Sequence, residues 1–146
     1  MEIQINSNQE IPGLKSQKIK RKLERVLKDL GFPDKELSIV FTDDRRIAHL
    51  NNRYLGRKGP TNVLAFPMED GRTSEFESIM LGDVVISVST ALRESKEHGE
   101  ALEHTIDRLL IHGLLHLLGY DHETSTAEAR RMEKEEKRLI TLFRED

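Results

Sequence analysis

The sequence predicts one α+β domain, residues 1–146, in which helices pack around a mixed sheet of about four strands. Three observations support this fold class. Several short segments have the length and the apolar pattern of strands. Longer segments carry apolar residues every three or four positions, as amphipathic helices do. One helical segment, 106–118, is apolar on nearly all sides, so we expect it to cross the sheet where other elements cover it.

The first third of the chain predicts strand, helix, strand and helix in turn. Residues 3–5 alternate apolar and polar side chains, as in a half-buried strand, and residues 36–42 repeat that alternation. Between them, 16–30 has apolar residues at helical spacing, and Gly31 ends the helix. The second helix has Thr42 or Asp43 as its cap and contains Ile47, Leu50, Asn51 and Tyr54.

The middle of the chain predicts two further strands on either side of a long loop. A basic loop at 56–60 leads into a strand at 62–66, which Pro67 closes. The polar segment 69–78 has no pattern and predicts a mobile loop. The strand at 81–87 is apolar almost throughout, which is typical of a central position in a sheet. Three helices follow, at 89–98, 102–118 and from 124 or 125 to 143.

Composition narrows the possible chemistry. The net charge of −3 gives no general attraction to polyanions, so nucleic acid could bind only at local basic patches. The chain has no cysteine, which excludes disulfides, thiolate metal sites and cysteine nucleophiles. It also shows no signal peptide and no run of eighteen apolar residues, so we expect a soluble cytoplasmic protein without membrane contact.

Two histidines interrupt the most apolar helix. His112 and His116 are four residues apart, so at about 100° per residue they point the same way, one turn apart. Gly119 suits the left-handed conformation that ends a helix, and the chain reversal would bring His122 toward the same point. Three imidazoles with a fourth position left for water are typical of a catalytic zinc site.

Two alternatives bear on this metal site. A core histidine bonded to backbone is the simpler reading for any one of the three, but two desolvated imidazoles on one leucine-rich face favour a metal. We expect zinc, although other divalent ions such as nickel and iron also accept three imidazoles. The spacing equals that of the long zinc-protease motif, yet Gly113 stands where that motif has its glutamate base. Hydrolysis of peptide or amide bonds is therefore the second hypothesis.

The histidine segment, HGLLHLLGYDH at 112–122, resembles the signature of the YbeY family of rRNA maturation factor endoribonucleases. TNVLAFP at 61–67 and LGDVVI at 81–86 are similar to two strands of that family, and the resemblance covers roughly 50–136. It implies a zinc-dependent endoribonuclease specific for single strands, with His112, His116 and His122 as metal ligands and catalytic residues. It also implies a role in maturation of the 16S rRNA 3′ end and in ribosome quality control, with rRNA and the ribosome or its small subunit as partners.

The chain departs from the family pattern at one position. The family usually has a Tyr-Arg-Gly step that is thought to supply a catalytic cation, whereas this chain has Leu55 in the middle of that step. Arg53, Arg57 or Lys58 could supply the cation and contact RNA phosphate from a shifted position, or activity could be reduced. A third hypothesis follows, in which the protein is a non-catalytic ribosome assembly factor whose metal only pins the chain after Gly119.

Two other features have both a functional and a structural interpretation. Asp121 could orient a ligand histidine through a hydrogen bond, or could simply be a turn residue. The basic run within 15–28 could be an RNA-binding stripe or a solvated helix face. The remaining histidines stand apart from the cluster and predict surface or hydrogen-bonded roles; they are His49, His98 and His104.

Overall fold

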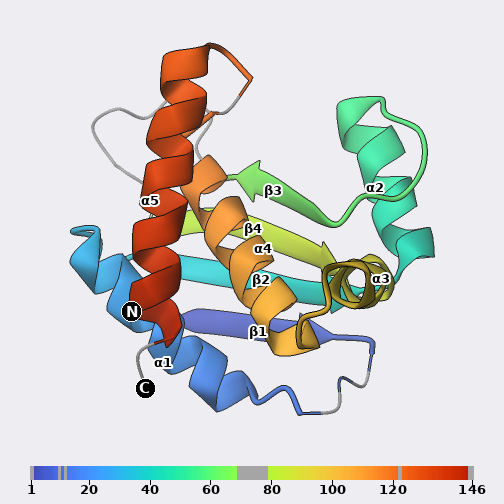
Figure 1. Ribbon diagram of the computed structural model, residues 1–146, viewed down its shortest axis with the longest axis horizontal. Helices are drawn as coiled ribbons and strands as arrows, with labels where there is room; N and C mark the ends of the chain where they lie inside the picture. Colours follow the sequence, from blue (N-terminus) through green and yellow to red (C-terminus); the bar gives the residue numbers. More distant parts are fainter. Residues whose placement is uncertain (1, 10, 12, 69–78, 122, 145–146) are drawn as a thin grey trace.

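The structure, a computed structural model, describes residues 2–9, 11, 13–68, 79–121 and 123–144 (Figure 1). Its elements are β1 (Ile3–Ser7), α1 (Ser16–Asp29), β2 (Glu36–Thr42), α2 (Asp44–Leu55), β3 (Val63–Pro67), β4 (Met80–Ser87), α3 (Val88–His98), α4 (Leu102–Leu117) and α5 (Thr126–Arg144). The described residues thus contain all four predicted strands and all five predicted helices. The loop predicted at 69–78 lies outside the described residues.

The four strands form one mixed sheet in the order β1-β2-β4-β3. β1 and β4 both run parallel to β2, and β3 is antiparallel to β4. The predicted central position of the strand at 81–87 is confirmed, because β4 has a neighbour on each side. Parallel neighbours need a connection that crosses over the sheet, and helices supply these connections here. The mixed sheet and the α+β class are therefore confirmed.

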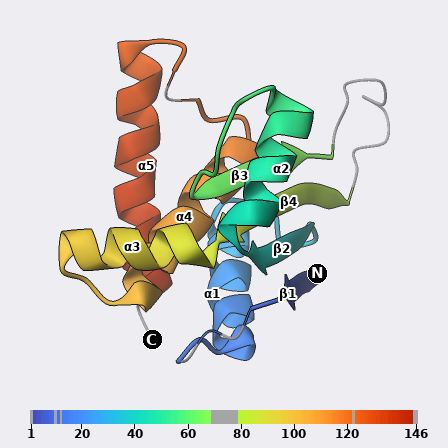
Figure 2. The same cartoon turned by 90° about the vertical axis from the view of Figure 1, so that its right-hand side faces the viewer.

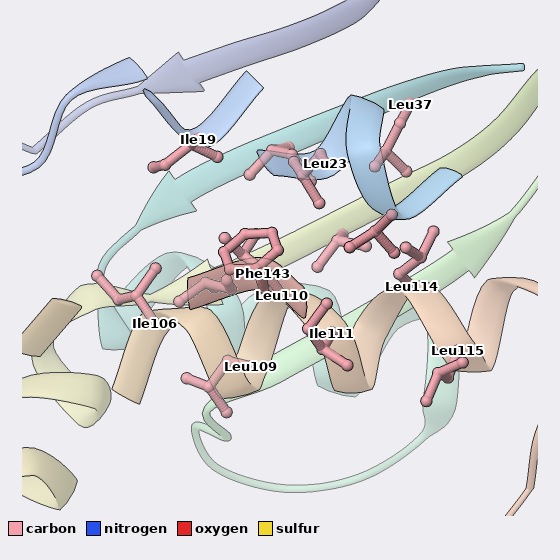
Figure 3. Close-up of a cluster of buried hydrophobic side chains, with 14 of the residues drawn as sticks. Ile19, Leu23, Leu37, Ile106, Leu109, Leu110, Ile111, Leu114, Leu115 and Phe143 are labelled. Atoms are coloured by element: carbon pink, nitrogen blue, oxygen red, sulfur yellow. The ribbon is translucent and has the colours of Figure 1, made fainter. Parts of the chain in front are cut away.

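Alternate residues of β4 face two separate apolar clusters. Val84 and Ile86 belong to the main core, which α1, α4 and α5 share with the sheet, and Figure 3 shows the α4 side chains in this core. Val85 points to the opposite face and packs with Ile47 of α2 and Leu64 of β3. Figure 2 shows α2 and α5 on opposite sides of the sheet. The sheet therefore has helices on both faces.

Helix α4 is the central helix of the main core. Nine of its sixteen residues are buried, and α5 packs over it on the side away from the sheet (Figure 1). The predicted covered position of the segment 106–118 is therefore confirmed. None of the helices among the described residues has the length and apolar character needed to cross a membrane.

A carboxylate fixes the position of α2. The Oδ1 atom of Asp44 accepts hydrogen bonds from the hydroxyls of Ser87 and Thr90, both at 2.6 Å, and its Oδ2 atom accepts one from Arg93 at 2.8 Å. Burial alone would raise the pKa of Asp44, but these three hydrogen bonds and the charge of Arg93 hold the pKa below its ordinary value. The carboxylate therefore stays ionised and ties the first turn of α2 to the start of α3.

Candidate functional site

The structure brings His112 and His116 together on one side of α4. Their Nε2 atoms lie 3.1 Å apart, and their ring planes are inclined at 76°. The predicted pairing of these two imidazoles is therefore present in the structure. His122 lies outside the described residues, so its convergence on the same point stays a prediction.

A carboxylate from α5 determines which nitrogen of His112 carries a proton. The Nδ1 atom of His112 lies 3.0 Å from Oε1 of Glu136. An ionised carboxylate only accepts hydrogen bonds, so Nδ1 must be the donor, and a neutral His112 then has its lone pair on Nε2. This arrangement, in which a carboxylate accepts the proton of one ring nitrogen while the other faces a metal, is common in histidine metal sites.

The two facing nitrogens fit a shared cation. With a lone pair on Nε2 of His112, a contact of 3.1 Å to Nε2 of His116 requires either a proton on His116 or a cation between the rings. Two nitrogens at about 2.05 Å from zinc, at the tetrahedral angle, lie about 3.3 Å apart. The observed separation is close to that value. No group of three or more His, Cys, Asp or Glu side chains suited to a metal occurs within the described part of the chain.

The chain reverses directly after this helix, as the sequence predicts. Gly119 has φ 95°, its N–H donates to the carbonyl of His116, and the N–H of Tyr120 donates to the carbonyl of Leu115. These two bonds are the Schellman motif that ends a helix. The hydroxyl of Tyr120 also donates to Glu135 of α5 at 3.4 Å. The chain that leads to His122 is thus held by α4 on one side and α5 on the other.

The histidine pair lines a pocket of about 590 Å³, a volume within the usual range for ligand sites. Three parts of the chain form it: the end of α2 with its loop, strand β3, and the end of α4 with the residues after it. The other residues that line the pocket are Leu55, Arg57, Thr61, Asn62, Val63, Leu64, Ala65, Pro67, Gly113, Gly119, Tyr120, Asp121 and Glu123. Strand β3 therefore borders the histidines, as the proposed phosphate contacts from the preceding loop require.

The loop before β3 brings one cation to the pocket. Buried Asn51 donates through Nδ2 to the carbonyl of Gly59 at 3.0 Å and so shapes this loop. Of the three predicted cations, Arg57 lines the histidine pocket, whereas Arg53 lines a second pocket, and Lys58 lines neither of the two. The best-placed candidate for a phosphate contact is thus Arg57. Leu55 also lines the histidine pocket, so that wall of the site carries an apolar side chain.

Asp121 and the basic run within 15–28 each had a functional and a structural interpretation, and their contacts favour the structural one in part. Asp121 Oδ1 accepts the backbone N–H of Glu123 at 2.8 Å, which is the turn role, although Asp121 also lines the histidine pocket. In the basic run of α1, Lys22 is buried and pairs with Asp107, while Lys18 pairs with Glu103 of α4. Part of that run therefore holds α1 against α4.

Gly113 lies where α4 packs closely against β4 of the sheet. A Cβ atom at this position would lie 2.6 Å from Cγ1 of Val84 on β4. Real side chains do not approach so closely, so only glycine fits without movement. The glutamate that the zinc proteases carry at this step has no room on this side of α4.

Glu136 is the site residue that sequence reasoning missed. It lies 24 residues after His112, on a helix whose charges show only an ordinary amphipathic pattern. Its role depends on how α5 packs against α4, and no local spacing reports that packing. Glu136 could be recognised as a partner of His112 only once α4 and α5 are packed against each other.

Replacing Glu136 by glutamine is expected to weaken zinc binding by about 10- to 100-fold. The amide keeps the size of the side chain but loses the charge that makes it a strong acceptor for the Nδ1 proton. Competition titration against a zinc chelator measures the effect. Glu133→Gln is the matched control, because Glu133 lies one turn earlier on α5 and pairs only with Lys137 among the described residues. Equal zinc affinity in both variants would contradict the role assigned to Glu136.

The fold and the pocket define the class of protein: an α+β domain with two histidines on its central helix, facing a pocket beside the sheet. A solved structure shares this fold over 97% of the chain and 88% of its own length, with a TM-score of 0.68 and 26% identity. It is the solution structure of TM1509 from Thermotoga maritima. The comparison places 97% of the chain in one known architecture.

Sequence comparison identifies the family. The family model described as Endoribonuclease YbeY matches residues 2–144. Proteins named Endoribonuclease YbeY from Geobacter metallireducens and Geobacter sulfurreducens are 42% and 43% identical over 144 residues, which is 98% of this chain and 96% of each relative. The relative from Aquifex aeolicus is 41% identical over 129 residues, covering 88% of this chain and 83% of its own. The chain therefore belongs to the endoribonuclease YbeY family, and the resemblance noted from its motifs is confirmed.

Proposed function

We propose that this protein is a zinc-dependent endoribonuclease that cuts single-stranded RNA. The observation that carries the proposal is the pair of Nε2 atoms 3.1 Å apart at a pocket, with Nδ1 of His112 held by Glu136. Membership of the endoribonuclease YbeY family supports the substrate class. We further propose that the substrate is rRNA, with maturation of the 16S 3′ end and ribosome quality control as the setting, and with the cytoplasm and the small ribosomal subunit as the place of action.

His112, His116 and, by the predicted chain reversal, His122 would hold the ion. When bound, zinc supplies Lewis acidity and lowers the pKa of a water molecule toward about 7. Two side chains of the protein have further roles at this site. Glu136 keeps the proton of His112 on Nδ1, so that its other nitrogen is available to a metal. Arg57 brings a positive charge to the pocket, where cleavage of a phosphodiester builds negative charge on oxygen.

The walls of the pocket favour a strand over a folded duplex. An RNA duplex is a wide, stiff object, whereas a single strand can lay one nucleotide at a time into a pocket of about 590 Å³. Asn62 lines the pocket just before β3, and its Nδ2 atom donates to Glu94 of α3, at 3.2 and 3.3 Å from the two carboxylate oxygens. Glu94 thus helps to hold this lining residue of the pocket in place.

Cleavage of labelled RNA by the purified full chain tests the proposal. We expect single-stranded RNA to be cut and duplex RNA of the same sequence to survive, with activity lost to a chelator and restored by zinc. Failure of the zinc-loaded protein to cut single-stranded RNA would contradict the nuclease function, and cleavage insensitive to chelation would contradict the metal dependence. RNA or ribosome binding without any turnover would instead support the assembly-factor hypothesis, which the apolar Leu55 at the pocket favours.

A further inference from the structure

The outward face of α2 carries a second concentration of positive charge, separate from the histidine pocket. Its side chains recur at helical spacing and are all exposed: Arg45, Arg46, His49, Arg53 and Tyr54. We call these five residues the α2 face. Together with Asn8, Asp43 and Leu50 they line a pocket of about 530 Å³. Figure 2 looks onto α2 from outside the molecule.

The charges of the α2 face are not used to hold the fold together. Among the described side chains, none forms an ion pair with Arg45, Arg46 or Arg53. The nearby carboxylates have other partners, because Asp43 accepts the N–H of residue 46 as the helix cap and Asp44 pairs with Arg93. The first turn of a helix is also an unfavourable place for cations, because the helix dipole is positive there. Stability therefore does not explain two arginines at this end of α2.

An aromatic ring completes the α2 face. The Tyr54 side chain is 59% exposed, and the guanidinium carbon of Arg53 lies 5.6 Å from the centre of its ring. The ring also packs against Phe66 of β3 in an edge-to-face arrangement, with centroids 5.5 Å apart. A supported, exposed aromatic ring beside arginines is the combination that binds single-stranded nucleic acid, by stacking a base while the cations contact phosphates.

The α2 face is adjacent to the histidine pocket. Tyr54 lines the second pocket, and the next residue, Leu55, lines the histidine pocket. Phe66, which supports Tyr54, belongs to β3, the strand that borders the histidines. A strand that leaves the histidine pocket past the end of α2 therefore meets Tyr54 first, then Arg53, and about two turns further along α2 reaches Arg46.

We propose that the α2 face binds the same RNA strand outside the cleavage pocket, as a second site for its backbone and one of its bases. The inference rests on the proposed function, since it takes the substrate to be single-stranded RNA. Arg46 and Arg53 are seven residues apart, about 10 Å along the helix, and so contact separate phosphates. Because the net charge of −3 repels RNA weakly, a local patch of this kind is needed to hold a strand.

Binding measured apart from cleavage tests the α2 face. All proteins carry His116→Ala so that labelled strands stay intact, and anisotropy gives the affinity for single-stranded RNA of about four and about twelve nucleotides. Adding Arg46→Ala and Arg53→Ala is expected to weaken binding of the longer strand at least about tenfold at moderate salt. The slope of log affinity against log salt should become shallower by about 1.4, or 0.7 for each lost contact. The short strand, which can fill the histidine pocket alone, should bind with less change.

The matched control removes two arginine or lysine charges elsewhere. Arg130 and Lys134 are exposed on α5, and Arg130→Ala with Lys134→Ala changes the net charge equally but should keep the affinity for the longer strand. Tyr54→Ala should lose affinity by about fivefold or more even at high salt, and Tyr54→Phe should restore it. Arg46→Ala alone should not lower the melting temperature, because it relieves an unfavourable charge in the first turn of α2, whereas Arg53 is in the last turn, where the helix dipole favours a cation.

The outcomes separate this inference from the proposed function. Equal affinity and salt slope in the Arg46/Arg53 variant and its reference would overturn the α2 face even if the protein with His116 intact cuts RNA. An equal loss in the α5 control would also overturn it, since the effect would then be one of net charge. Loss confined to the α2 variants upholds it whether or not cleavage is observed, because binding is measured with cleavage disabled.

Discussion

Replacing His116 by alanine is expected to lower cleavage of single-stranded RNA by at least about 10³-fold. The substitution removes one of the two facing nitrogens, and with it the metal that would stabilise charge on the reacting phosphate by several kcal/mol. Four kcal/mol of lost stabilisation is about three factors of ten in rate. The same variant should retain no stoichiometric zinc, measured by metal analysis of the purified protein.

His104→Ala is the matched control, because His104 is exposed on the same helix and does not line the histidine pocket. We expect it to keep both zinc and activity. Near-normal cleavage by His116→Ala, with the protein folded, would remove the basis of the proposed mechanism. Circular dichroism of both variants shows whether any loss is due to unfolding.

Replacing Gly113 by alanine is expected to destabilise the protein by about 1–3 kcal/mol. The new methyl group would meet Val84 at 2.6 Å, so α4 or β4 must move apart at the centre of the core. Chemical denaturation measures the free energy of unfolding. Because the histidines lie directly before and three residues after this position, the shift should also lower zinc affinity.

A double substitution separates crowding from other effects of Gly113→Ala. Val84→Ala removes the atoms that the new methyl group would meet and leaves a cavity when made alone. If crowding is the cause, the double variant is less destabilised than the sum of the two single variants. Additive losses would show that the close approach of α4 and β4 is not what requires glycine. The same crowding predicts that Gly113→Glu lowers the yield of folded protein and does not create a peptidase.

Most of the fold could be predicted because its elements have clear periods and end signals. The helix at α4 illustrates this: its apolar pattern, the two histidines one turn apart and the ending glycine were all readable, and the structure shows each of them. The sequence also placed β4 at the centre of the sheet from its continuous apolar character. Hydrophobic burial dictates these features, and a single sequence reports burial well.

The parts that could not be predicted depend on which elements meet. Glu136 acts on His112 across two helices, and Gly113 matters because a particular valine lies opposite it. Arg53 and Arg57 are four residues apart in one basic segment, yet they line different pockets because α2 ends between them at Gly56, where φ is 66°. Position along the chain could not separate these two arginines.

The placement of α5 has a consequence for how the protein matures. α5 is the last of the described elements to leave the ribosome during synthesis, and it carries both Glu136, beside His112, and Glu135, beside Tyr120. A nascent chain that has formed the sheet and α4 therefore still lacks the carboxylate that sets the proton of His112. Completion of the histidine pair is therefore coupled to the synthesis of α5, and a chain released before α5 would have the strands of this enzyme without the carboxylate beside His112.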